Sequence, residues 1–218
     1  MDVSLETIVL WAVPVVFAIT LHEAAHGYVA KLFGDRTAEM LGRITLNPLK
    51  HIDPVGTILV PGMLLALAWM SKSPPFVFGW AKPVPVNYAN LRDPRRDMIW
   101  VAAAGPGSNF LQALFWATAY MVSAPSGGFP SAGLFEMADI GFKVNLVLMA
   151  LNLLPLPPLD GGRVLAGLLP QAASNTLSRI EPYGFLIILA MLALGWLDDL
   201  MRPLVRIAGS VINRIIGL

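Results

Sequence analysis

The chain has 218 residues, of which 56% are hydrophobic and 13% are charged. Soluble globular domains carry about 25% charged residues, so this composition favours a chain with several membrane spans over one or two soluble domains. The net charge of +1 gives no reason to expect a nucleic-acid partner, and the absence of cysteine excludes disulfides and thiolate metal ligands.

Successive apolar runs predict an all-α polytopic membrane protein, because about 20 apolar residues are enough for a helix to span a bilayer. The predicted helices cover residues 4–33, 98–123, 137–156 and 183–200, and a shorter apolar run lies at 55–70. The tail at 203–217 mixes arginines with aliphatic residues, which is typical of an amphipathic helix at the membrane interface. We interpret residues 1–218 as one membrane-embedded domain whose N-terminus lacks the pattern of a cleaved signal peptide.

Two stretches between these runs favour extended backbone. In MLGRITL (40–46) apolar and polar residues alternate enough to suggest a short strand or hairpin. In VFGWAKPVPVN (77–87) the prolines and the residues before them disfavour helix. The sequence therefore predicts a β-hairpin or an extended segment beside the helices.

The first predicted helix carries HEAAH, residues 22–26, within an apolar run. Residues four apart share one helix face about 6 Å apart along the axis, so His22 and His26 can bind one zinc ion. Glu23 lies beside them, where a carboxylate can take a proton from water. Ionisable residues inside a membrane mark functional sites by default, although packing into a polar crevice and an ion-transport pathway are alternative interpretations.

A catalytic zinc site needs a third protein ligand. The candidates are His51, Asp53, Glu136, Asp139 and Asp160. Asp160 is best placed, because prolines unwind the chain before it and two glycines after it allow a close backbone approach. An ordinary Asp-Gly turn is the alternative interpretation.

The depth of Asp160 depends on how the chain crosses the membrane. From Thr7 to His22 is about 22 Å of helix, and the distance from Val144 to Asp160 is similar. Both sites reach one depth only if their helices are parallel, which requires the run at 55–70 to be re-entrant rather than spanning. Most basic residues then fall on one side, which the positive-inside rule makes cytoplasmic. The same orientation puts the C-terminal tail outside the cell, although its arginines favour the cytoplasmic side.

Three motifs occur in an order that resembles the site-2 protease family of intramembrane zinc metalloproteases. They are HEAAH at 22–26, GPGSN at 105–109 and NLLPLPPLDG at 152–161. GRITLNPLKHIDPVGT and FGWAKPVPVN resemble a small prokaryotic branch of that family without a regulatory insert such as a PDZ domain.

The resemblance implies one zinc ion per chain, with His22, His26 and Asp160 as ligands and Glu23 as the catalytic acid and base. It also implies a three-helix catalytic core and a hairpin-like segment that can pair with an unwound substrate. Asn109 and Asn152 match asparagines that could hold the substrate backbone or the oxyanion, with helix–helix hydrogen bonding as the alternative. The remaining histidine, His51, lies in a polar loop and is either a packing residue or a gate at the mouth of the site.

The expected function is regulated intramembrane proteolysis of transmembrane protein substrates by a multi-pass protein of the cell membrane. The active site is expected near the cytoplasmic face of the bilayer. Two alternatives are a catalytically inactive relative that binds membrane partners and a metal or proton transporter. A transporter needs polar residues that continue toward the outer surface, and the outer halves of the first and fourth runs offer almost none.

Overall fold

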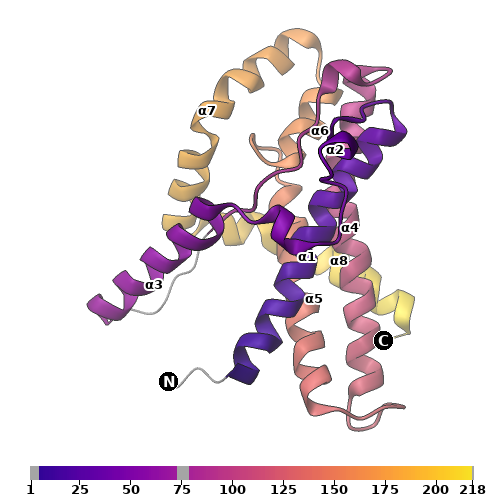
Figure 1. The fold of residues 1–218 in the computed structure, drawn as a ribbon, viewed down its shortest axis with the longest axis vertical. Coiled ribbons are helices and arrows are strands. Elements are labelled where there is room, and N and C mark those ends of the chain that lie inside the picture. The colour runs from indigo at the N-terminus through magenta and orange to yellow at the C-terminus, as the bar shows by residue number, and fades with distance from the viewer. Residues whose placement is uncertain (1–4, 73–78, 218) are drawn as a thin grey trace.

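The computed structural model describes residues 5–72 and 79–217, and these ranges contain helices but no strand (Figure 1). The longer helices are α1 (Leu5–Leu32), α3 (Val60–Ser71), α4 (Pro94–Ser123), α5 (Ala132–Asn152), α7 (Gln171–Ala193) and α8 (Trp196–Ile216). The shorter elements are α2 (Thr37–Met40), η1 (Pro48–His51), η2 (Pro54–Leu59), η3 (Tyr88–Asn90) and α6 (Asp160–Leu168). The all-α fold class is confirmed.

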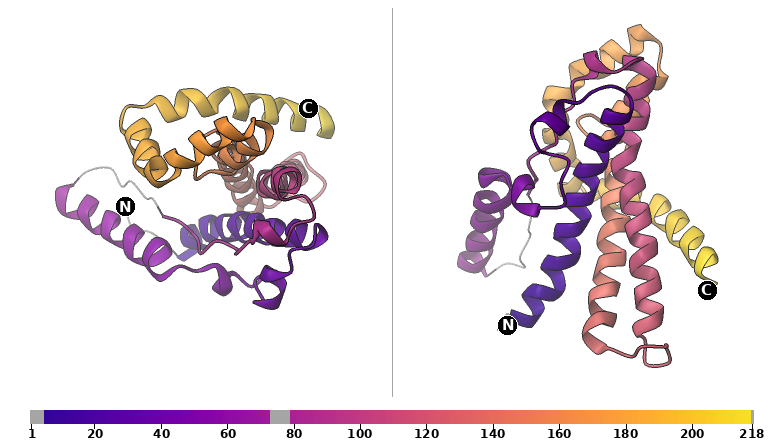
Figure 2. Two further views of the ribbon diagram at one scale, coloured as in Figure 1. Left: turned by 90° about the horizontal axis from the view of Figure 1, so that it is seen from above. Right: turned by 45° about the vertical axis from the view of Figure 1, so that its right-hand side comes forward.

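Three helices form the core of the molecule. Helix α4 packs against α1, α5 and α6, and α1 also packs against α5. Helices α1 and α5 run in the same direction and α4 runs in the opposite one, as both figures of the ribbon show (Figures 1 and 2). Small residues allow this close approach: on Gly141 of α5 a side-chain carbon would collide with the indole of Trp116 on α4.

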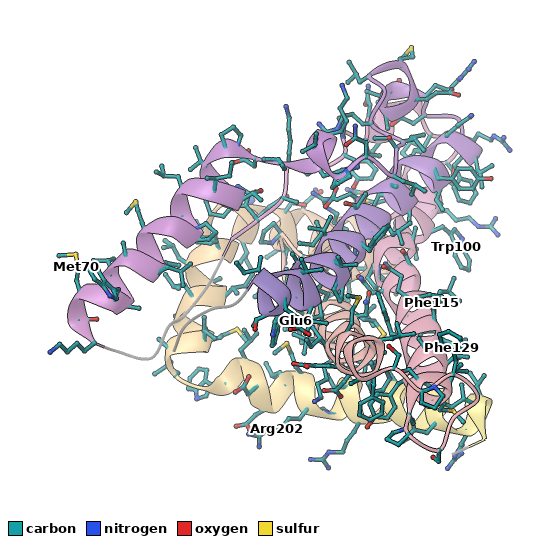
Figure 3. All side chains as sticks on the ribbon, turned by 60° about the horizontal axis from the view of Figure 1, so that its bottom comes forward. Glu6, Met70, Trp100, Phe115, Phe129 and Arg202 are labelled. Atoms are coloured by element: carbon teal, nitrogen blue, oxygen red, sulfur yellow. The ribbon has the colours of Figure 1, made fainter. Side chains whose placement is uncertain are left out.

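The apolar surface of the described helices suits a bilayer. Glu6–Leu32, Pro54–Ser71 and Gln171–Ala193 are long and apolar enough to cross a membrane. Helices α4 and α5 are not among them: α4 begins with charged residues and buries Asn109 and Gln112, and α5 carries three charged residues that are not buried. The outer face of α4 is nevertheless apolar over much of its length: Trp100 and Phe115, 57% and 63% exposed, point outward (Figure 3). The protein is a multi-pass membrane protein.

The segment at 54–71 leaves the bundle, and its beginning lies close to residue 80, after the segment. It starts as a π-helical turn, η2, and continues as α3, none of whose side chains is buried. The backbone N–H of Trp80 donates to the carbonyl of Gly56 at 3.1 Å, and the hydroxyl of Thr57 donates to the carbonyl of Trp80 at 2.8 Å. The chain therefore comes back to the beginning of the segment, although Pro54–Ser71 is also long enough to span. Its re-entrant placement stays a prediction.

The helix predicted at 183–200 and the tail helix predicted at 203–217 have different bounds in the structure. Helix α7 already begins at Gln171, with a polar first half that an apolar pattern does not detect. It ends before Gly195, whose φ of 74° lies in the left-handed region, and α8 begins directly afterwards at Trp196. The apolar face of α8 packs on α4 and α5, where Ala208 and Ile212 are buried.

The strand suggested for residues 40–46 is wrong. The carboxylate of Asp35 accepts hydrogen bonds from the backbone N–H and the hydroxyl of Thr37, the first residue of the short helix α2, which ends at Met40. Turns and bends follow it. The extended prediction holds for residues 79–87, which form neither helix nor strand before η3, whereas Val77 and Phe78 lie outside the described residues.

Candidate metal centre and active site

The side chains of His22, His26 and Asp160 meet between α1 and α6. The two histidine Nε2 atoms are 3.1 Å apart, and Asp160 Oδ2 lies 3.2 Å from that of His22 and 3.3 Å from that of His26. All three residues are buried. In the part of the chain that the structure describes, they form the one group of His and carboxylate side chains close enough to hold a metal ion. The other candidates for the third ligand are not part of it.

Local sequence explains how Asp160 reaches the histidines. Helix α5 ends at Asn152, and the proline-rich turn that follows leads to α6, which begins at Asp160 itself. A side-chain carbon on Gly161 would overlap the carbonyl oxygens of Leu153 and Leu154. Glycine at this position therefore lets the turn fold tightly enough to bring the side chain of Asp160 to the two histidines of α1.

Both histidines use their other ring nitrogen for an orienting hydrogen bond. The Nδ1 atom of His26 is 2.7 Å from the carbonyl oxygen of Val101, and the Nδ1 atom of His22 is 2.6 Å from Asn109 Oδ1. A carbonyl oxygen only accepts, so each Nδ1 carries the proton and each Nε2 presents a lone pair. This is the usual arrangement of metal-binding histidines.

The donor set fits a metal ion. Two Nε2 lone pairs and one carboxylate oxygen converge, and Asp160 Oδ2 is a buried oxygen with no hydrogen-bond donor. Such a set repels itself unless a cation lies between its members, and two imidazoles with a carboxylate match a catalytic zinc site. The space also depends on Gly105 of α4, where a side-chain carbon would lie 2.6 Å from His22 Nε2.

Glu23 is held by the extended segment, residues 79–87, which we call the strap. The Glu23 Oε2 atom accepts a hydrogen bond from the backbone N–H of Val84 at 2.7 Å. Pro83 and Pro85 have no N–H, so Val84 supplies the one backbone donor in this stretch of three residues. The Pro-Val-Pro pattern therefore aims a single donor at Glu23.

The strap is itself fixed by the loop before it. The N–H of Lys82 donates to the carbonyl of His51 at 2.9 Å, and Arg43 Nη2 donates to the carbonyl of Lys82 at 2.9 Å. The His51 ring is buried, and its Nε2 lies 3.1 Å from the carbonyl of Thr45. His51 thus supports the strap through its backbone and stays outside the metal-binding group.

The two asparagines of the family motifs lie in different surroundings. Asn109 is fully buried, and its carboxamide contacts His22, Ala18 and Asn145. Asn152 is half-buried at the end of α5 and donates to the carbonyl of Leu148 within its own helix. Asn109 is therefore engaged inside the bundle, whereas Asn152 lies on a partly open surface.

The sequence interpretation missed three groups: the carbonyl of Val101, the N–H of Val84 and the side chain of Asn145. The first two are backbone groups, which no residue pattern identifies. Asn145 did leave a signal, because it is one of two amides in the apolar run at 137–156, and buried polar residues in membrane helices generally bond across helices.

Comparison with known proteins places the chain in a family. A protein of Bacillus subtilis (strain 168) named "Putative zinc metalloprotease YwhC" is 41% identical over 184 residues, which cover 82% of this chain and 78% of that protein. The chain belongs to the site-2 proteases, Peptidase family M50. The model of Peptidase family M50 matches residues 118–195, which include Asn152 and Asp160.

Two further relatives share a lower identity with the chain. "Putative zinc metalloprotease Rip2" of Mycolicibacterium smegmatis is 30% identical over 80% of this chain and 63% of that protein. The protein of the same name from Mycobacterium tuberculosis (strain H37Rv) is 26% identical over 90% of this chain and 76% of that protein. No solved structure matches the chain. Zinc is the metal of this family, in agreement with the donor set of the site.

Proposed function

We propose that this protein is an intramembrane zinc metalloendopeptidase that cleaves transmembrane segments of membrane proteins. The observation that carries this proposal is the buried group of His22, His26 and Asp160 with Glu23 beside it, set among helices whose outer faces are apolar. Membership of the site-2 proteases supports the same conclusion.

The residues would divide the chemistry as follows. His22, His26 and Asp160 would hold zinc, which supplies a Lewis acid that polarises a carbonyl and makes water more acidic. Glu23 would take the proton of the attacking water and return it to the leaving amine. The N–H of Val84 would hold the carboxylate of Glu23 in place for both transfers. Asn152, partly exposed at the end of α5, would contact the substrate backbone or the oxyanion.

A transmembrane substrate must unwind before it can be cleaved, because a helix protects its own amides. Addition of the unwound segment to the strap as a strand would satisfy the freed backbone groups. One edge of the strap is already in use, since the N–H groups of Trp80, Lys82 and Val84 all bond to the protein itself. A substrate strand would therefore pair with the other edge or displace one of these bonds.

The proposed orientation places the active site near the cytoplasmic face of the cell membrane. His22 lies in the second half of α1, toward the loops that carry most of the basic residues. The return of the strap to Gly56 supports a re-entrant segment at 54–71, which keeps α1 and α5 parallel.

Cleavage of transmembrane peptides by the purified protein tests the proposal. In detergent, the wild-type protein should contain about one zinc ion per chain and cut helical peptides that carry helix-breaking residues. Glu23→Gln should keep the zinc and lose cleavage, because glutamine is similar in shape but does not accept the proton. Cleavage retained in Glu23→Gln would remove Glu23 as the base. A wild-type protein that binds zinc but cleaves no peptide would favour the alternative of a catalytically inactive relative that binds membrane partners.

A further inference from the structure

A chain of buried amides connects the three core helices behind the metal centre. On α4, Asn109 Oδ1 faces His22 Nδ1 of α1 at 2.6 Å, and Asn109 Nδ2 donates to Asn145 Oδ1 of α5 at 2.9 Å. Asn145 Nδ2 in turn donates to the carbonyl of Gly141 at 2.9 Å. Both asparagines are fully buried, so neither reaches solvent or substrate in this structure.

Two backbone carbonyls fix the direction of every hydrogen bond in this chain. Asn109 Nδ2 also donates to the carbonyl of Ala18 at 3.1 Å, and the chain ends at the carbonyl of Gly141. Carbonyl oxygens only accept, so both amides must turn their nitrogens toward them. Asn145 Oδ1 then faces Asn109, and Asn109 Oδ1 faces His22. The acceptor at His22 Nδ1 is therefore set by the backbone of α1 and α5.

We propose that Asn109 and Asn145 are positioning residues that hold His22 in the tautomer required for binding the metal. With a proton on Nδ1 held by Asn109, the lone pair of His22 Nε2 must point at Asp160 and His26. This role replaces the expected contact of Asn109 with substrate. It rests on the proposed zinc site, and it predicts effects on metal affinity that do not require turnover.

Zinc affinity of matched variants tests this proposal, measured by competition with a chromophoric chelator in detergent. Asn109→Leu should weaken zinc binding about 10- to 100-fold, the usual effect of removing an outer partner of a metal ligand. Asn145→Leu should weaken it less, because the Ala18 carbonyl still orients Asn109. Gln112→Leu is the matched control: Gln112 is a buried amide one turn further along α4 that also donates to Ala18 but bonds no histidine. It should bind zinc within about threefold of the wild type.

Thermal unfolding of the zinc-free proteins separates positioning from folding. Asn109→Leu should lower the unfolding temperature of the zinc-free protein more than Gln112→Leu, because Asn109 bonds three partners closely and Gln112 makes two hydrogen bonds of 3.3 and 3.4 Å. The proposal expects the loss of zinc affinity in Asn109→Leu at temperatures where the zinc-free variant is still folded. If Asn109→Leu does not fold, Asn145→Leu decides, because it leaves Asn109 bonded to Ala18 and should still bind zinc more weakly than Gln112→Leu. Wild-type zinc affinity in Asn109→Leu, wild-type zinc affinity in Asn145→Leu where Asn109→Leu does not fold, or an equal loss in Gln112→Leu would overturn the proposal. A wild-type protein that binds no zinc would instead overturn the proposed function.

Discussion

The two histidines of HEAAH are oriented by different kinds of group. His26 bonds the backbone carbonyl of Val101, which is present whatever the side chain at 101, whereas His22 bonds the side chain of Asn109. A single substitution can therefore remove the partner of His22 but not that of His26. At the scale of single residues, His22 is the more sensitive of the two ligands.

Gly105 is the residue whose enlargement should disturb the metal centre most directly. In Gly105→Ala the new carbon would lie within 2.6 Å of both ring atoms Nε2 and Cε1 of His22, so the imidazoles must shift. Overpacking of this kind costs about 1–3 kcal/mol, and we expect zinc affinity to fall by about tenfold or more. Gly107→Ala is the control, because a carbon at Gly107 meets no other atom within 4 Å. Equal zinc affinity in the two variants, measured by chelator competition, would contradict this account.

The hydrogen bond from Val84 to Glu23 can be removed without touching Glu23. Val84→Pro takes away the N–H, and we expect kcat/KM on a transmembrane peptide to fall by about tenfold, as for loss of a charge-assisted hydrogen bond. Zinc content should not change. Val84→Ala keeps the N–H and controls for the lost packing of a buried valine. If the alanine variant is as impaired as the proline variant, Glu23 does not depend on this donor.

The sequence predicts those parts of the site that depend on local spacing and not those that depend on contacts between distant segments. Spacing along a helix was enough to pair His22 with His26. The prolines and glycines around Asp160 made it the best-placed third candidate, but an ordinary Asp-Gly turn fitted the same residues, and the choice rested mainly on the resemblance to the site-2 proteases. The donor at Val84 depends on how a loop folds back across α1, and the role of Asn145 depends on the register between α4 and α5. Neither relation is contained in local sequence spacing.

At the scale of elements, the break between α7 and α8 separates an apolar helix from an amphipathic one. The apolar pattern continues through the break, so hydropathy alone joins the two into one helix at 183–200. What ends α7 is a backbone conformation at Gly195 that other residues adopt with difficulty. Helix α8 can then cross the bundle and bury Ala208 and Ile212.

Gly195→Ala should destabilise this connection. A left-handed conformation costs an alanine about 1–2 kcal/mol, so the unfolding temperature in detergent should fall. Gly209→Ala is the control, and it should raise the unfolding temperature. Gly209 is inside α8, where alanine favours helix by about 0.5–1 kcal/mol relative to glycine. A side-chain carbon there would meet only an ordinary contact at 3.8 Å. An unfolding temperature that does not fall in Gly195→Ala would mean that the turn tolerates another conformation.

At the scale of the whole molecule, the parallel directions of α1 and α5 bring ligands from distant parts of the chain together. His22 and Asp160 are separated by most of the sequence, and they meet because both helices lead toward the same end of the bundle (Figure 1). The sequence predicted this relation from matching helix lengths. It could not predict where α8 packs, because an amphipathic face fits either lipid or a protein groove.

Single cysteines can test the orientation, since the natural chain has none. A re-entrant segment at 54–71 puts Lys50 and Ser126 on opposite sides of the membrane, whereas a spanning segment puts them on the same side. We expect a membrane-impermeant thiol reagent to label Ser126→Cys in intact cells and to label Lys50→Cys only after the cells are opened. Labelling of both variants, or of neither, in intact cells would show that 54–71 crosses the bilayer.

We expect this fold to assemble one zinc site from His22, His26 and Asp160. X-ray absorption at the zinc edge of the purified protein tests it most directly, with Asp160→Asn for comparison. We expect about one zinc per chain, with two imidazole nitrogens at about 2.0–2.1 Å and carboxylate oxygen at about 2.0–2.2 Å, and weaker binding in Asp160→Asn. A purified protein without bound zinc, or a spectrum without histidine ligands, would contradict it.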